Sequence, residues 1–222
     1  MNINASIIDQ RVIGIVEDHP EWLPEGGDLN KKKSAAFVLL SMSTCLELSL
    51  EEVAELLTEG GNDAGVDGLH VGEVEDGEFL VTLFQGKYKV KDLTGEANFP
   101  ENGVEKSMNT VQVLFDPYRK VALNKKIAPK IEEIRSLIRD AYIPNVRVVL
   151  CNNGARWKRQ ADLWIEAAKK DYADKVEFIH FNHDTIVNIL QKTEKVDERV
   201  TLSGQAIIED MNFMRVLEIG RA

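Results

Sequence analysis

The stretch GGNDAGVDGLHVGEVEDGEFLVTLFQGKYK, residues 60–89, decides the fold. Val66–Val71 and Phe79–Gln85 are rich in β-branched, leucine and aromatic residues, with an Asp-Gly pair between them, which predicts a β-hairpin. Asp67 begins the first strand between glycines, and Gln85 and Lys87 end the second. A carboxylate, an amide oxygen and an ammonium group are therefore expected at the open end of the hairpin.

The length of the hairpin loop decides whether these polar side chains share one face of the sheet. A two-residue loop would turn Asp67 away from Gln85 and Lys87. A three-residue loop, Glu75-Asp76-Gly77, would place Asp67 opposite Gln85 and keep Lys87 on the same face. Gly77 would then occupy the left-handed position that follows a type I turn. We therefore predict the three-residue loop.

The order of elements outside the hairpin predicts an α/β fold. Two helices are expected within residues 33–58, and further helices over 104–115, 127–141, 157–172 and 184–190, from the spacing of apolar residues. Strands are expected at Val146–Cys151, whose apolar run is typical of a central strand, and at Val176–Phe181. The resulting order predicts a mixed sheet with helices on both faces.

Three segments are expected along the chain. Residues 1–32 are an amino-terminal arm, helical or irregular, and residues 33–195 form the α/β domain. Val200–Ile208 and Arg215–Ile219 have strand character but no partner in that domain. Residues 196–222 are therefore expected to begin a further domain or a carboxy-terminal extension that is truncated.

Composition and charge narrow the class of protein. The chain is 44% hydrophobic and 29% charged, as expected of a globular protein. It has no apolar run of membrane-spanning length and no signal pattern, so we expect a cytoplasmic protein with reduced cysteines and no membrane partner. A homo-oligomer is compatible with this composition. The net charge of −10 opposes nucleic-acid binding, but residues 119–135 concentrate six basic side chains.

The hairpin motif resembles a known family. The pattern Gly-x-Asp-x-Gly-x-Asp-Gly at residues 61–68, followed by an apolar strand that ends Gln85-Gly86-Lys87, is similar to the PD-(D/E)xK nuclease superfamily in its Mrr-like branch, where Gln often replaces the second acidic residue. Residues 62–68 and 84–88 resemble more closely the amino-terminal domain of AIPR proteins, which are linked to abortive infection and phage resistance. The similarity in element order covers residues 33–192. It implies a restriction-endonuclease-like core of αβββαβ type with a helical insertion.

The resemblance also implies an activity and its residues. It suggests a metal-dependent endonuclease of anti-phage defence that hydrolyses the phosphodiesters of nucleic acid, with DNA as the expected substrate. Asp67, Gln85 and Lys87 would be catalytic. Asp67 and Gln85, with Asp63 as a further candidate, would hold Mg²⁺ or Mn²⁺, which prefer oxygen ligands. The lysines expected to contact nucleic acid are Lys89, Lys125 and Lys126.

Three alternatives remain open from the residues. Asp63 could join the metal site, but it is better suited to anchor its loop through a side-chain-to-backbone turn. Asp67 and Lys87 could form an ion pair that only stiffens the hairpin. The family often has a helix Glu near the position of Val38, and its absence favours a second function: a weak or inactive nuclease-fold module that binds nucleic acid or a phage component.

Overall fold

The structure is a computed structural model that describes residues 2–26, 28–58, 60–116, 118, 121–172, 175–192, 206–211 and 214–219. The chain divides into two units, Met1–Gln191 and Lys192–Ala222. In the second unit, β5 (Ala206–Met211) pairs with β6 (Met214–Ile219) in an antiparallel ladder. Residues 200–205 of the first strand expected there lie outside the described residues. Among the described helices, none has both the length and the apolar character that a membrane crossing requires.

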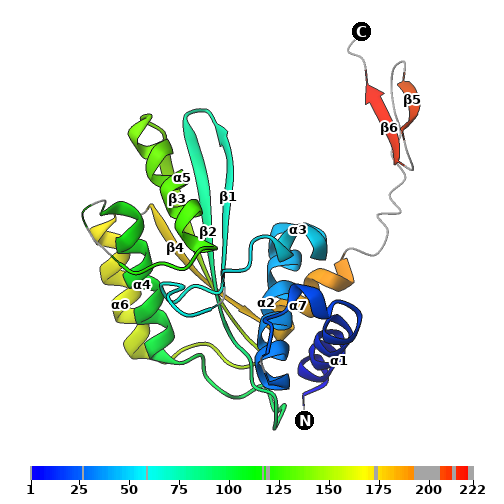
Figure 1. Ribbon diagram of the computed structural model, residues 1–222. Coiled ribbons are helices and arrows are strands. Elements are labelled where there is room, and N and C mark those ends of the chain that lie inside the picture. The colour runs from blue at the N-terminus through cyan, green and yellow to red at the C-terminus, as the bar shows by residue number, and fades with distance from the viewer. Residues whose placement is uncertain are drawn as a thin grey trace. The chain divides into compact units, whose positions relative to one another are not determined.

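The first unit is built on a four-stranded sheet with the strand order β1-β2-β3-β4 (Figure 1). The strands are β1 (Gly68–Glu75), β2 (Glu78–Lys87), β3 (Ile143–Asn152) and β4 (Val176–Asn182). β1 runs antiparallel to β2, whereas β3 runs parallel to both of its neighbours, β2 and β4. Helices α4 (Glu101–Phe115) and α5 (Ile127–Arg139) connect β2 to β3, and α6 (Arg159–Asp171) connects β3 to β4. The predicted mixed sheet is confirmed.

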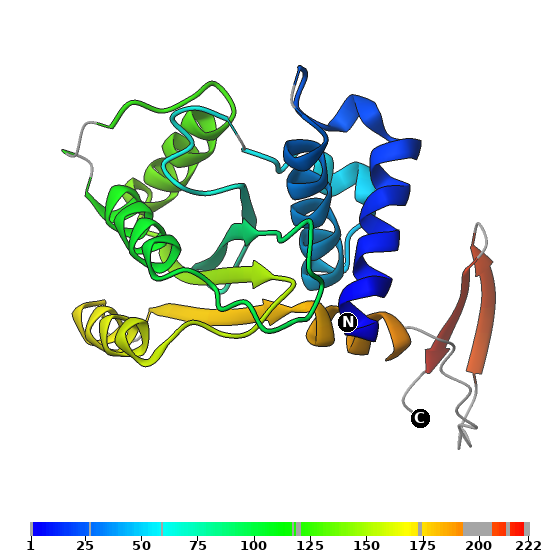
Figure 2. The same cartoon turned by 90° about the horizontal axis from the view of Figure 1, so that it is seen from below.

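Helices cover both faces of the sheet, as Figure 2 shows. On one face, α4, α5 and α6 bury a core that includes Leu69, Val81 and Leu83. On the other face lie α1 (Ile3–Asp18), α2 (Leu29–Leu46), α3 (Leu50–Ala54) and α7 (His183–Lys192), with the short η1 (Pro20–Trp22) after α1. Their core includes Phe37, Phe84 and Val149. The predicted α/β class with helices on both faces is therefore confirmed at this level.

The stretch expected to be an amino-terminal arm contains α1, which packs on α2, and the beginning of α2 itself. The Asn2 side chain accepts a hydrogen bond from the Ala5 N–H (3.0 Å) and caps α1. The residues of α1 buried at helical spacing are Ala5, Ile8, Val12 and Ile15. Burial of an apolar stripe is what stabilises such a helix.

The predicted three-residue hairpin loop is wrong. Glu75 pairs with Glu78, so Asp76-Gly77 is a two-residue turn, and both residues have positive φ, 50° and 81°. This is the combination that a type I′ hairpin turn requires. A β-bulge between Val71 and Val74 then inserts one extra residue into β1. Beyond the bulge, the pairing from Val71↔Val81 to Gly68↔Phe84 has the register that the three-residue loop would have given.

Helix α2 approaches the sheet closely where the hairpin opens. A Cβ at Gly86 would lie 2.5 Å from Val38 Cγ2, and a Cβ at Gly68 would lie 2.4 Å from Met42 Sδ. Both distances are shorter than van der Waals contact, so a larger residue at Gly86 would push against the short Val38 side chain of α2, and one at Gly68 would displace the Met42 side chain. The glycines therefore bring the helix to the end of the hairpin that carries Asp67 and Lys87.

The turn gives a matched pair of substitutions. Gly77→Ala should lower the free energy of unfolding by about 1 kcal/mol, because Ala must adopt a left-handed backbone there although no atom crowds its Cβ. Gly14→Ala, equally uncrowded but inside α1, should raise it by about 0.5–1 kcal/mol. Urea denaturation of both variants measures the difference. Shifts of the same sign would contradict the positive φ at Gly77.

Candidate functional site

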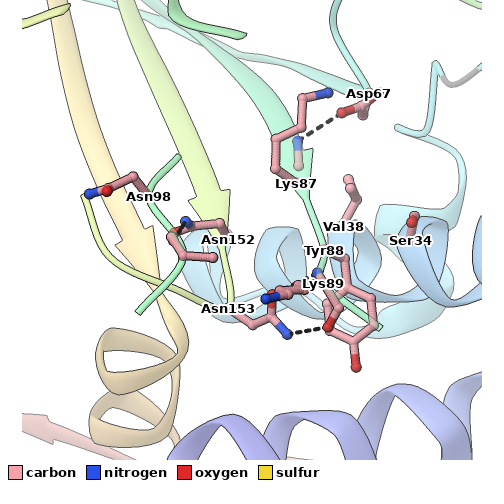
Figure 3. A pocket seen from close by; sticks show the side chains of 11 residues that line it. Ser34, Val38, Asp67, Lys87, Tyr88, Lys89, Asn98, Asn152 and Asn153 are labelled. Carbon is pink, nitrogen blue, oxygen red and sulfur yellow. Dashed lines mark hydrogen bonds between the residues drawn. The ribbon is translucent and has the colours of Figure 1, made fainter. Parts of the chain in front are cut away.

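A pocket of about 430 Å³ lies at the end of the hairpin, where β2 and β3 finish at their carboxyl ends (Figure 3). In α/β sheets with parallel strands, this edge is where ligands commonly bind. The pocket is lined by Val38 of α2, by Asp67 before β1, by residues 86–89, and by amide side chains. These amides are Asn98, Asn152 and Asn153.

The Asp67 carboxylate is fixed by the backbone of β2. Its Oδ2 accepts a hydrogen bond from the Gly86 N–H (2.7 Å), and its own N–H donates to the Phe84 carbonyl (2.8 Å). Among the hydrogen bonds of the described residues, the carboxylate makes only the one to Gly86. Its second oxygen is therefore able to accept a bond from a ligand at the pocket.

The surroundings of Asp67 make its negative charge costly. Burial raises the pKa of the carboxyl above its ordinary value, and the nearby Asp63 carboxylate raises it further. The Gly86 N–H, Lys87 and Lys106 lower this pKa, but less than burial raises it. A carboxylate with a perturbed pKa in a pocket is a common feature of functional sites.

Lys87 shares the pocket with Asp67 but does not neutralise it directly. Figure 3 shows the two side chains pointing toward each other. Among the ion pairs of the described residues, with an N···O limit of 4.0 Å, none joins them. The ion pair that would only stiffen the hairpin is therefore not formed at contact distance, although both side chains line the same pocket.

The wall opposite Asp67 is held by asparagines that clamp loop backbones. The Asn153 amide accepts a hydrogen bond from the Lys89 N–H and donates one to the Lys89 carbonyl, both at 2.8 Å. Asn152 donates to the carbonyls of Ala97 and Ala155, while its oxygen lies 2.8 Å from His180 Nε2. Two residues at the end of one strand therefore position the segments on both sides of the pocket.

Tyr88 is fixed from the opposite side, by α1 and α2. Its hydroxyl donates to the Asp9 carboxylate, which also pairs with Lys33 Nζ at 3.1 Å. Its ring stacks on Phe37 with centroids 5.1 Å apart. Burial and the Asp9 carboxylate raise the pKa of the Tyr88 hydroxyl above its ordinary value. Tyr88 is therefore a neutral, immobilised aromatic side chain in the pocket wall.

The Gln85 side chain does not line this pocket. It is 3% exposed, and its Oε1 accepts a hydrogen bond from the Ser107 hydroxyl of α4 (2.8 Å). Gln85 lies on the same side of β2 as Leu83, which faces α4 to α6, whereas Phe84 and Gly86 face α2. The regular pairing of β1 with β2 ends at Gly68, and the Asp67 carboxylate instead accepts the Gly86 N–H. The structure thus brings Asp67 and Lys87 together, with Gln85 behind them against α4.

The remaining predicted residues lie at different distances from the pocket. Asp63 Oδ1 accepts a hydrogen bond from the Gly65 N–H (2.7 Å), which is the loop-anchoring turn. Asp63 also lines a neighbouring hollow together with Asp67. Lys89 lines the main pocket, whereas Lys125 and Lys126 are exposed at the start of α5 and do not line it.

The donor set suits a hydrated hard cation better than a closed metal cage. Among the described residues, no group of three or more His, Cys, Asp or Glu side chains is placed to hold a metal ion. Mg²⁺ keeps several waters and commonly uses one or two carboxylates together with substrate phosphates. Asp67, with Asp63 as the second carboxylate, fits that pattern.

Sequence reasoning missed Lys106 and the asparagine clamp. Lys106 lies on α4, and its Cβ would be 3.0 Å from a Cβ added at Gly65, which places it beside the Asp63–Asp67 loop. No local pattern marks it. Asn152-Asn153 had a usable signal, because two polar residues directly follow a buried strand that is expected to be parallel.

Comparisons with known proteins give no match: the scan against family models, the search of curated proteins and the search of solved structures each find none for this chain.

The raised pKa of Asp67 predicts how stability depends on pH. Because the folded-state pKa lies above the ordinary value of 3.8, the ionised carboxylate destabilises the fold at neutral pH. Asp67→Asn should therefore raise the free energy of unfolding at pH 7. The gain should shrink as the pH falls through the folded-state pKa toward 3.8. Urea denaturation across this pH range, without divalent cations, measures it. A variant that is less stable than wild type at pH 7 would contradict the assignment.

Proposed function

We propose that the protein is a metal-dependent phosphodiesterase that acts on nucleic acid. The observation that carries this proposal is that Asp67 and Lys87 line one pocket without forming a direct ion pair. The Asp67 carboxylate is held by the Gly86 N–H, and its burial makes the negative charge costly. A phosphodiester and a cation placed between these two side chains would satisfy both charges.

The residues of the chain have separate tasks in this proposal. Asp67, with Asp63 nearby, would hold Mg²⁺ or Mn²⁺, which would supply positive charge at the phosphate and make water more acidic. Lys87 would place its ammonium group beside the phosphate oxygens and stabilise the negative charge that develops on them. Lys106 would add a second positive charge near Asp67 from α4.

The finer parts of the proposal rest on the sequence resemblance. A restriction-endonuclease-like core, a DNA substrate and a role in anti-phage defence follow from the Asp67…Gln85-Gly86-Lys87 motif and from the order of elements around it. The position of Val38 supports the comparison of α2 with the family's preceding helix, because Val38 lines the pocket beside Asp67.

Two observations favour a second candidate, a nuclease-fold module that binds nucleic acid or a phage component without cutting it. Val38 is apolar and 3% exposed where the family often has a carboxylate. Gln85 Oε1 already accepts the Ser107 hydroxyl rather than lining the pocket. Both features reduce the number of oxygen ligands beside Asp67. A site with fewer oxygen ligands binds a metal ion more weakly.

Cleavage assays separate activity from its absence. The wild-type chain should cut plasmid or single-stranded DNA in Mg²⁺ or Mn²⁺ and should stop cutting when a chelator is added. Lys87→Ala should lower the rate by about 100-fold or more, since it removes the charge-stabilising group. The control is Lys170→Ala, which removes an exposed lysine from α6 and should leave the rate unchanged. Equal rates for wild type and Lys87→Ala would exclude the proposed role of Lys87.

Metal binding distinguishes the two candidates without a cleavage readout. A Val38→Glu substitution places a further carboxylate beside Asp67, so it should tighten Mn²⁺ binding by about tenfold or more if this is a metal site. Val38→Gln has nearly the same shape without the charge and should give a much smaller gain. Isothermal titration calorimetry with Mn²⁺ measures both, and circular dichroism checks that each variant is folded. No Mn²⁺ binding in wild type or in folded Val38→Glu would favour the non-cutting module.

A further inference from the structure

A second hollow continues the pocket along α2. It has a volume of about 410 Å³ and shares Ser34 and Tyr88 with the pocket at Asp67. We call the combined surface the α2 groove. It runs from Asp67 past Tyr88 to the start of α2, and its lysine, hydroxyl and phenol side chains are Lys31, Ser34, Lys87, Tyr88, Lys89 and Lys91.

The charge of the α2 groove is opposite to that of the whole chain. The protein has a net charge of −10, but the groove contains four lysines against two carboxylates, Asp67 and Asp28. Asp28 is occupied as the N-cap of α2, where its Oδ1 accepts the Lys31 N–H (2.9 Å). Within the described part of the chain, no ion pair involves any of the four lysines. They are therefore available to an anionic ligand.

The other acidic groups near Asp67 lie in a separate hollow. It has a volume of about 380 Å³, and it brings Asp63 and Glu25 to the same place as Asp67, with Lys31 also in its wall. Asp67 thus stands at the boundary between an acidic hollow, which attracts cations, and a basic groove, which attracts phosphates. A linear polyanion that follows the groove would end at Asp67 and Lys87.

An aromatic ring occupies the middle of the α2 groove. Tyr88 lines both parts of the groove, and it is held by Asp9 and by stacking on Phe37. Single-stranded nucleic-acid sites combine a basic track for the backbone with aromatic side chains that contact the bases. A ring that is already immobilised loses little conformational entropy when a base packs against it.

We propose that the substrate is a single strand of nucleic acid, which lies in the α2 groove with its backbone on Lys89, Lys91 and Lys31 and passes Tyr88 to reach Asp67 and Lys87. Each part of the groove has the volume of a small-molecule site, enough for parts of one nucleotide but not for a paired duplex. Duplex readers instead insert a protruding helix or β-ribbon into a groove of the DNA. This inference rests on the proposed function, because it takes Asp67 and Lys87 as the reacting end.

Binding experiments in chelator test the inference without cleavage. Fluorescence anisotropy would compare labelled oligothymidylate, oligouridylate and a DNA duplex of equal length on the wild-type chain at several salt concentrations. Single strands should bind at least tenfold more tightly than the duplex. The two single-stranded probes distinguish DNA from RNA.

A matched pair of double variants locates the site. The Lys31→Ala, Lys91→Ala variant should weaken single-strand binding and reduce the slope of log affinity against log salt by about 1.4, or roughly 0.7 for each phosphate that is no longer neutralised. Lys169→Ala, Lys170→Ala on α6 removes the same charge far from the groove along the chain and should leave the slope unchanged. Equal effects of the two double variants, or duplex binding as tight as single-strand binding, would overturn the inference.

Failure of this inference is distinguishable from failure of the proposed function. Single-strand binding that depends on Lys31 and Lys91, without cleavage under any metal condition, would refute the phosphodiesterase and leave the groove assignment intact. Cleavage of duplex DNA that depends on Lys87 but not on Lys31 and Lys91 would refute the groove assignment and leave the phosphodiesterase intact.

Discussion

The hydrogen bond from the Gly86 N–H to the Asp67 carboxylate is the constraint on which the site depends. It substitutes a side-chain oxygen for a backbone acceptor at the end of the β1–β2 ladder, so it ends the strand pairing and holds the carboxylate in one place. Nearby, the Thr58 hydroxyl donates to the Val66 carbonyl (2.7 Å) and the Thr58 N–H to the Asp67 carbonyl (3.0 Å). Since these buried backbone groups are all paired, the irregular end of the hairpin is stable rather than frayed.

Around this fixed carboxylate, the pocket is assembled by tethers from three directions. Gly86 allows α2 to bring Val38 against the sheet, Asn153 holds Lys89 by both backbone groups, and Asp9 holds the Tyr88 hydroxyl. Each tether joins segments that are distant in sequence. The segment at the end of β2, which carries Tyr88 and Lys89, is therefore held on both sides. This limits the reorganisation needed when a ligand binds.

Particular residues show how much of the fold and of the candidate site can be predicted from the sequence. The Asp-Gly pair and the alternating apolar residues predicted the hairpin, and apolar spacing predicted α4 to α7 close to their observed bounds. The loop length was wrong, because a bulge of one residue in β1 restores the register that the shorter turn would have shifted. Such compensation leaves no mark in periodicity alone. The Gln85–Ser107 bond and the position of Lys106 depend on how α4 packs, which is a tertiary contact with no local signal.

The electrostatics of Asp67 link the occupancy of the site to its protonation. Burial favours the neutral acid, and the two nearby lysines only partly oppose that preference. A divalent cation beside the carboxylate would favour the ionised form more strongly, so binding the cation and releasing the proton are coupled. In the proposed function, the same coupling would favour the joint binding of a cation and a phosphodiester, because a cation at Asp67 would leave Lys87 and the basic groove free to hold the phosphate. In the proposed function, a chain with a net charge of −10 would concentrate its affinity for a polyanion at the end of the hairpin where Asp67 and Lys87 line one pocket.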